Sequence, residues 1–126
     1  MTQEDKELLL KDLTARLPYG VKIELTWWVM GEGTYINAAL EPDHIEQLLN
    51  DEDGDIEIKP YLFPLSRMTE EQKMFLRQQN WCIAISTSGT VETTIEGINW
   101  LNKNHFDYRN LINKNLAIDC TNLNIY

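Results

Sequence analysis

Residues 21–30, VKIELTWWVM, alternate between two kinds of side chain, and this pattern constrains the fold more than any other in the chain. One set of alternate positions is entirely apolar and consists of Val21, Ile23, Leu25, Trp27 and Val29. The other set mixes charged and polar side chains with Trp28 and Met30. Because successive side chains of a strand point to opposite faces, the pattern predicts a strand with one face on a core.

The residues after this strand predict a hairpin. GEGT, residues 31–34, has the composition of a loop, and YINAAL, residues 35–40, that of a return strand. A four-residue loop would pair Val29 with Ile36, which keeps the apolar faces of the two strands together. We expect that register.

Capping and stop signals predict several short helices. Thr2 is a suitable N-cap for a first helix, which the Pro-Tyr-Gly segment 18–20 ends. Pro42 suits the first position of a second helix. Two further helices are predicted by capping boxes that begin at Thr69 and at Thr93.

Three further segments predict strands. IEIKPYLFPL has the pattern of a short strand that runs into an extended segment, since Pro60 and Pro64 forbid a long helix. WCIAIS is an apolar strand followed by the polar turn TSGT, and LAID is a last short strand. Residues 1–126 are therefore predicted to form a single α+β domain, with several short helices packed on a small, mostly antiparallel sheet.

The net charge of −9 lies almost entirely in the first part of the chain. Residues 41–57 alone contain eight acids and no Lys or Arg. Such a surface repels phosphate backbones, so we expect no direct nucleic-acid binding. Two interpretations remain: a solvated surface that aids solubility, or a patch that attracts a basic protein partner.

The chain lacks the features of a secreted or membrane protein. Its first residues, MTQEDKELLL, are acidic rather than basic, and no apolar stretch approaches the roughly 20 residues of a membrane span. Cys82 and Cys120 lie far apart in apolar runs, as expected for reduced, buried thiols. We therefore expect a cytoplasmic protein without membrane contact.

The acidic turn has the beginning of a calcium loop but not the rest. Asp51, Asp53 and Asp55 occupy alternate positions, as the first ligands of an EF-hand do. The next position requires glycine and is Ile56, and the twelfth requires glutamate and is Leu62. An EF-hand is therefore rejected.

No other metal or cofactor motif is present. The two histidines and two cysteines include no close pair of the kind that zinc sites use. There is also no glycine-rich phosphate loop and no serine in a nucleophile elbow. We expect no metal, no cofactor, no catalytic residues and hence no enzyme.

Four functional side chains lie within five residues of the tail: His105, Asp107, Tyr108 and Arg109. Asp107 is predicted to cap a short helix, with its carboxylate accepting from the amides of Arg109 or Asn110. Arg109 then pairs with a carboxylate from the acidic half. Binding through Tyr108 and Arg109 is the alternative, and catalysis would need a hydrogen bond from His105 to Asp107 with a nucleophile nearby.

Trp27 and Trp28 must face opposite ways because they are adjacent in a strand. Trp28 falls on the mixed face, with Asn37 as its expected cross-strand neighbour and Tyr35 and Met30 beside it. A helix lying over this face is one interpretation. An exposed group of Trp, Tyr and Met would instead mark a binding surface for a partner or a ligand.

Half of the chain resembles a family of small uncharacterised proteins encoded by phages, prophages and mobile elements of gut bacteria. The resemblance rests on KPYL at 59–62, Pro64, MTEEQ at 68–72, WLN at 100–102, His105, DYR at 107–109, LI at 111–112, LAI at 116–118 and Tyr126. It implies an origin and a cytoplasmic accessory role, not an activity.

These observations favour a non-enzymatic protein-interaction module, with inhibition of a host process as one form of that function. The alternative is a homo-oligomer that binds and sequesters a nucleotide or another small ligand through a charge-assisted contact and ring stacking. An enzyme centred on His105 is the third hypothesis. The candidate binding residues are Trp28, Tyr35, Tyr108 and Arg109.

Overall fold

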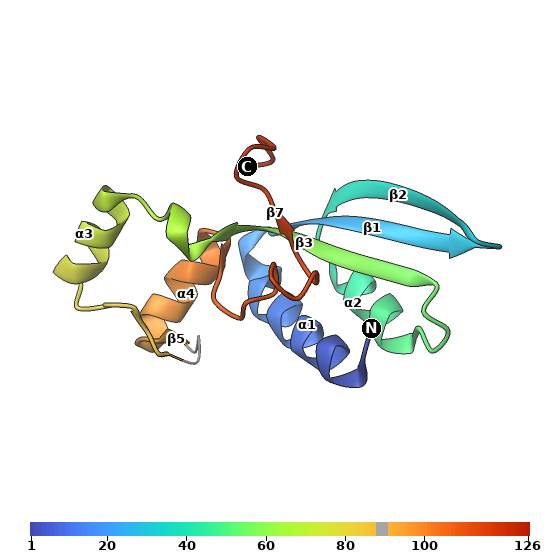
Figure 1. Cartoon of the computed structure of the whole chain (residues 1–126), viewed down its shortest axis with the longest axis horizontal. Helices are drawn as coiled ribbons and strands as arrows, with labels where there is room; N and C mark the ends of the chain where they lie inside the picture. The colour runs from blue at the N-terminus through green and yellow to red at the C-terminus, as the bar shows by residue number, and fades with distance from the viewer. Residues whose placement is uncertain (88–90) are drawn as a thin grey trace.

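The computed structural model describes residues 1–87 and 91–126, with the exception of the Tyr35 side chain (Figure 1). As predicted, these residues form an α+β structure with short helices packed on a mostly antiparallel sheet. The helices are α1 (Gln3–Arg16), α2 (Pro42–Asn50), α3 (Glu70–Gln78) and α4 (Ile95–Lys103), with 3-10 turns at Leu17–Tyr19 and Leu65–Arg67.

The main sheet has the strand order β2-β1-β3-β6, with β7 also paired to β3. Its strands are β1 (Lys22–Val29), β2 (Glu32–Ala39), β3 (Ile56–Pro64), β6 (Phe106–Asp107) and β7 (Ile118–Asp119). β1 is antiparallel to both β2 and β3, whereas β6 and β7 run parallel to β3. A separate ribbon pairs β4 (Ala84–Ile85) with β5 (Val91–Glu92).

The local capping signals of α1 and α3 are confirmed. The Thr2 hydroxyl accepts a hydrogen bond from the amide of Asp5 at 3.1 Å, and the turn after the helix ends at Gly20 with a φ of 70°. Thr69 and Gln72 form both bonds of a capping box, at 3.1 and 2.9 Å. These helix starts therefore follow from short-range hydrogen bonding.

The predicted capping box at Thr93 is wrong by one residue. The N-cap of α4 is Thr94, whose hydroxyl accepts from the amide of Gly97 at 3.0 Å. The Thr93 hydroxyl instead donates to the carbonyl of Trp81 at 3.3 Å. A contact distant in sequence therefore removes Thr93 from the cap.

The hairpin register also differs from the prediction. Val29 pairs with Glu32 rather than Ile36, and Met30 and Gly31 form a two-residue turn with φ values of 52° and 83°. Positive φ at both turn residues matches the twist of the flanking strands. The predicted register differs from the observed one by four residues. Because four is an even number, the apolar faces of the two strands coincide in both registers, so the alternation of side chains could not distinguish them.

β3 is one long strand that continues through Pro60, where we predicted only a short one. The amide of Trp28 donates to the carbonyl of Asp55 at 2.8 Å, which shows that the odd-numbered backbone groups of β3 face β1. The nitrogen of Pro60 therefore faces away from β1. On that side pairing with β7 begins only at Tyr61, so the proline removes no ladder hydrogen bond.

The strand predicted for the apolar run at 81–86 is much shorter in the structure. Only Ala84 and Ile85 are in strand β4, and both are exposed. The turn predicted at 87–90 lies partly outside the described residues.

The described residues bury two apolar clusters, and β3 runs from one to the other (Figure 1). The first lies between the β1–β3 sheet, the helices α1 and α2, and the tail, and it includes Leu9, Leu13, Ile23, Leu25, Ile58 and Leu111. The second contains Leu101, Phe106 and Tyr108. Both α1 and α2 lie on the same side of the sheet, which leaves the other face of β1 and β2 without a helix. Among the described helices, none combines the length and apolar character needed to cross a membrane.

The hairpin turn gives a stability prediction. Met30 is 99% exposed and adopts a left-handed conformation that an unbranched apolar side chain disfavours. Met30→Asn creates the Asn-Gly pair preferred in such turns and should raise the free energy of unfolding by about 0.5–1 kcal/mol in urea denaturation. Met30→Ala is the control and should change little, so equal effects of the two variants would contradict the assigned turn.

Candidate functional site

Three apolar side chains are exposed to solvent at the end of the β1–β2 hairpin, which projects beyond the other elements (Figure 1). Trp28 is 44% exposed, Val29 67% and Met30 99%. The interpretation that a helix covers Trp28 is therefore wrong, because α1 and α2 pack on the opposite face. Contiguous exposed apolar side chains of this kind are typical of interaction surfaces.

The ring of Trp28 is held in place by Gly33. The two residues are cross-strand partners, and a Cβ added to Gly33 would lie 2.9 Å from Cζ3 of the tryptophan ring. The ring thus packs directly on the glycine backbone. A glycine within a strand often marks such a close approach. This signal was hidden in the predicted register, which placed Gly33 in a loop.

The cross-strand partner that we predicted for Trp28, Asn37, lies elsewhere in the ladder, and Gly33 takes its place. Asn37 is opposite Glu24, and its Oδ1 accepts from the Tyr61 hydroxyl at 2.6 Å. Tyr35 is opposite Thr26, and its side chain lies outside the described part of the structure. The change of partner follows from the four-residue shift in register, whereas Tyr35 keeps a position diagonal to Trp28 in the ladder.

An acidic loop borders the exposed hairpin end. The hydrogen bond from the Trp28 amide to the Asp55 carbonyl joins the two. The loop is fixed by Asp51, whose carboxylate accepts from the amides of Asp55 and Ile56, each at 3.1 Å. Two exposed acids lie at this border: Glu32, which pairs with Val29, and Asp55, whose carbonyl bonds the Trp28 amide. The adjoining loop also exposes Glu52 and Asp53. The hairpin end therefore combines an apolar centre with a negatively charged rim.

The residues considered as metal ligands do not gather. Both oxygens of the Asp51 carboxylate accept from backbone amides, and the described residues include no group of three or more potential ligands. Cys82 is exposed, contrary to the expectation of a buried thiol, because the segment around it does not form a core strand. Cys120 is buried, and burial raises the pKa of its thiol to about 11.

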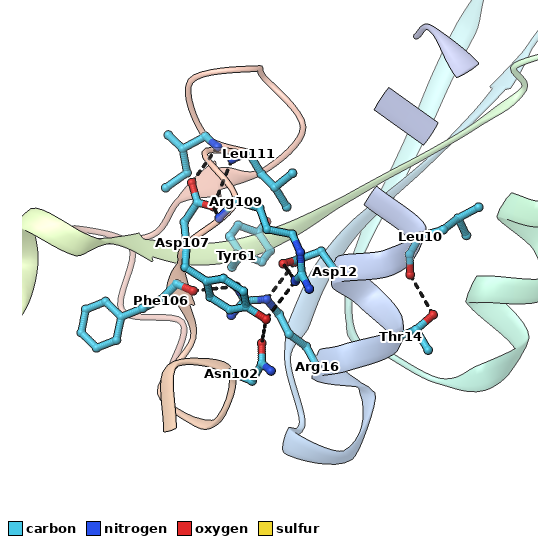
Figure 2. Close-up of polar contacts among 12 residues, drawn as sticks. Leu10, Asp12, Thr14, Arg16, Tyr61, Asn102, Phe106, Asp107, Arg109 and Leu111 are labelled. Atoms are coloured by element: carbon cyan, nitrogen blue, oxygen red, sulfur yellow. Dashed lines mark hydrogen bonds and ion pairs between the residues drawn. The ribbon is translucent and has the colours of Figure 1, made fainter. Parts of the chain in front are cut away.

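Arg109 is part of a buried ionic cluster with Asp12 and Arg16 (Figure 2). One carboxylate oxygen of Asp12 accepts from Nη1 of Arg109 and the other from Nε of Arg16, both at 2.8 Å. The side chains of Asp12 and Arg16 are fully buried, and that of Arg109 is 16% exposed. The predicted pairing of Arg109 with a carboxylate of the acidic half is confirmed.

Tyr108 lies within the same cluster rather than at an open site. Its hydroxyl donates to Oδ1 of Asn102 at 2.8 Å and accepts from Nη1 of Arg109 at 2.9 Å. The guanidinium carbons of Arg16 and Arg109 lie 5.2 and 4.6 Å from the centre of its ring, distances typical of cation–π contacts. The polar groups of Tyr108 and Arg109 are thus engaged within the fold.

Asp107 organises a turn, not the helix that we predicted. Its carboxylate accepts from the amides of Arg109, Leu111 and Ile112, at 3.3, 3.0 and 3.0 Å. The expected bond from Arg109 is present, but Asn110 has a φ of 60°, and a left-handed residue ends any helix at this point.

His105 is packed against Tyr126 and makes no hydrogen bond to Asp107. The two rings are stacked with centroids 3.8 Å apart, and Nδ1 of His105 has no hydrogen-bond partner among the described atoms. Burial lowers the pKa of His105 to about 4, with smaller contributions from the positive charges of Arg16 and Lys22. The His105–Asp107 pair that catalysis would require is therefore not formed in this structure.

Of the predicted binding residues whose side chains the structure describes, none lines the groove of about 690 Å³. This groove lies between the start of α1, β3 and the turn at 114–116, away from the hairpin end. Tyr108 lines a second hollow of about 360 Å³, but it is only 9% exposed. Of the four candidates, only Trp28 presents a large, described side chain to solvent.

The buried cluster gives a second stability prediction. Asp12→Ala leaves the fully buried guanidinium of Arg16 without its counter-ion, which should lower the free energy of unfolding by about 3–5 kcal/mol. Lys73→Ala removes the exposed pair with Glu70 and is the control, with an expected loss below about 1 kcal/mol in the same urea denaturation. Similar losses for the two variants would contradict a stabilising role for the cluster.

The low pKa of His105 predicts a pH dependence. Between pH 6.5 and about 4 the unfolded chain binds a proton at this residue and the folded chain does not, so stability falls as the pH decreases through that window. In the variant His105→Asn, asparagine tolerates the φ of 63° at this position and has no side-chain group that binds a proton in this pH range. Urea denaturation of the variant should show a shallower loss of stability over that range, and an unchanged slope would show that His105 does not contribute.

Comparison with known proteins gives no match. No family model matches the chain, and no similar curated protein or solved structure is found. Function is therefore inferred from the exposed hairpin end and from the contacts of the tail.

Proposed function

We propose that this chain is a non-enzymatic protein-interaction module that binds its partner through the end of the β1–β2 hairpin. The observation that carries the proposal is the half-exposed ring of Trp28, packed on Gly33 and followed by the exposed side chains of Val29 and Met30. Tryptophan and methionine are enriched at protein interfaces, and tryptophan is prominent among the residues that dominate binding energy. A ring that already packs on the strand backbone in the free protein should lose less entropy on binding than an unpacked one.

The acidic border indicates the kind of partner. Glu32 and Asp55 are exposed beside the apolar centre, and the adjoining loop exposes Glu52 and Asp53 as well. A partner with an apolar pocket rimmed by Lys or Arg would match both features, and opposite charge at the rim speeds association and fixes orientation. The partner proposed is accordingly a basic protein. The resemblance to phage and mobile-element proteins favours a host protein as that partner and inhibition of a host process as the outcome.

The alternative of a nucleotide-binding homo-oligomer has less support. It assigns ligand contacts to Tyr108 and Arg109, which are held by Asn102 and Asp12. Turning Arg109 toward a ligand would remove one of the two guanidinium partners of the buried Asp12 carboxylate, at a cost in stability. Trp28 alone does not provide a pocket for a nucleotide.

Partner capture with matched variants tests the proposal. Tagged wild-type protein, Trp28→Ala and Ile95→Ala are incubated with lysate of a gut bacterium, and bound proteins are quantified. Ile95 is 79% exposed on α4, far along the chain from the hairpin, so it controls for loss of an exposed apolar side chain. We expect a stoichiometric, basic partner with the wild type and Ile95→Ala, and at least about tenfold less with Trp28→Ala, as for a hot-spot residue.

A second variant tests whether binding depends on the position of the Trp28 ring and not only on its presence. Gly33→Ala keeps Trp28 but forces its ring to move, since the new Cβ would lie 2.9 Å from Cζ3. Binding should weaken, and the fluorescence emission of the variant should shift. Equal capture by wild type and Trp28→Ala would refute the proposed surface.

A further inference from the structure

The outer edge of β2 carries unpaired backbone groups in a defined pattern. The Leu40 amide donates to the Val21 carbonyl at 2.9 Å, so the even-numbered backbone groups of β2 face β1. The N–H and C=O groups of Gly33, Tyr35, Asn37 and Ala39 therefore face outward. β2 ends the strand order β2-β1-β3-β6, and no further described strand pairs with it.

This edge lacks the features by which natural proteins prevent pairing with other strands. The β1–β2 ladder is continuous over eight residue pairs, without a bulge. Residues 32–39, EGTYINAA, contain no Lys, Arg or Pro. Short length, bulges, proline and lysine are the usual protections of an edge strand, so this one is open to the addition of another strand.

Charge at the two ends of β2 decides between possible occupants. Glu32 begins the strand, Glu41 follows its end, and both are exposed. In two copies of the chain paired edge to edge about Ile36, Glu32 of one copy would lie opposite Leu40 of the other, the residue before Glu41, at both ends of the interface. Acids would thus gather at both ends, and each copy has a net charge of −9, so the two copies repel each other. An extended segment with positive charges near its ends avoids both penalties.

The same edge is adjacent to Trp28. The Trp28 ring covers Gly33, and the backbone groups of Gly33 face the open side of β2. A strand added there would lie about 4.8 Å from Gly33. Because Gly33 has no side chain of its own, a side chain of the added strand opposite it would reach the tryptophan ring.

We infer that β2 is the docking site for an extended segment of a protein, with Lys or Arg near each end, that joins the sheet as an additional outer strand. This inference rests on the proposed function and specifies how the basic partner is bound. Backbone hydrogen bonds supply affinity, Trp28 contacts the side chain opposite Gly33, and Glu32 and Glu41 select the charged ends.

Peptide mixtures and hydrogen exchange test this binding mode on the full chain. The probe is a mixture of octapeptides with Lys at both ends and Val, Ile, Thr or Tyr between. The controls are the same mixture with Glu at both ends, and the Lys mixture with alternate N-methylated amides. The Lys mixture should slow exchange of the outward amides at 33, 35, 37 and 39 by at least about tenfold. The amides at 34, 36 and 38 are already in the β1 ladder and should change little.

Variants of the terminal acids test charge selection. Glu32→Gln with Glu41→Gln should weaken binding of the Lys mixture by roughly three- to tenfold, the effect of two cross-strand charge pairs. Glu92→Gln, an exposed acid on β5, should leave it unchanged. The Glu mixture and the N-methylated mixture should not protect the outward amides.

The outcomes separate this inference from the proposed function. A Lys mixture that changes Trp28 fluorescence without slowing exchange at the outward amides would overturn strand addition and leave the hairpin end as the binding surface. Equal protection by the Lys and Glu mixtures would overturn the charge selection. No protection by any mixture would overturn strand addition, while partner capture by wild type and not by Trp28→Ala would still support the proposed function.

Discussion

The ionic cluster of Asp12, Arg16 and Arg109 is the interaction on which the arrangement of the chain depends. It joins α1 to the tail, because one buried carboxylate binds a guanidinium from each, and Nη2 of Arg16 also donates to the carbonyl of Phe106 in β6 at 2.6 Å. Burying charges costs free energy, which paired and hydrogen-bonded groups offset. Here each charged group has an ion-pair partner, although Nη1 of Arg16 has no hydrogen-bond partner among the described atoms. The ring of Tyr108, which both guanidinium groups contact, provides further stabilisation for the two positive charges. The cluster thus specifies how the tail packs as much as it stabilises the fold.

The same cluster limits where function can reside. The tail contains the polar side chains that look most like a site in the sequence, yet Asp107 binds three backbone amides, Tyr108 binds Asn102, and Arg109 binds Asp12. The hairpin end has the opposite character. Its backbone is fixed by the β1–β2 ladder and by the bond to the Asp55 carbonyl, while its apolar side chains remain exposed. Apolar side chains that are exposed on an ordered backbone are better suited to binding a partner than to packing the protein's own core.

Features that depend on neighbouring residues were predictable, and features that depend on distant contacts were not. The helix start at Thr2, the capping box at Thr69 and the alternating strand β1 follow from local chemistry and are confirmed. The hairpin register was not predictable from alternation, because a shift of four residues preserves the pattern. Arg16 has the position of an ordinary helix C-terminal cation, and nothing nearby in sequence indicates its full burial. For the candidate site, the mixed face identified Trp28, but its contact with Gly33 required the true register.

The distribution of charge connects the buried cluster to the proposed recognition. The buried ionic residues comprise Asp12, Asp107 and Arg16 with the largely buried Arg109, so their formal charges cancel. The net charge of −9 therefore lies on the surface, and many of its acids are in the hairpin turn, α2 and the adjoining loop. A field of this sign attracts basic partners and repels a second copy of the chain as well as nucleic acid. Because opposite charge mainly increases the rate of association, the proposed binding would divide between two features: the field would speed the approach of a partner, and the contacts of Trp28 and the β2 edge would set its rate of dissociation.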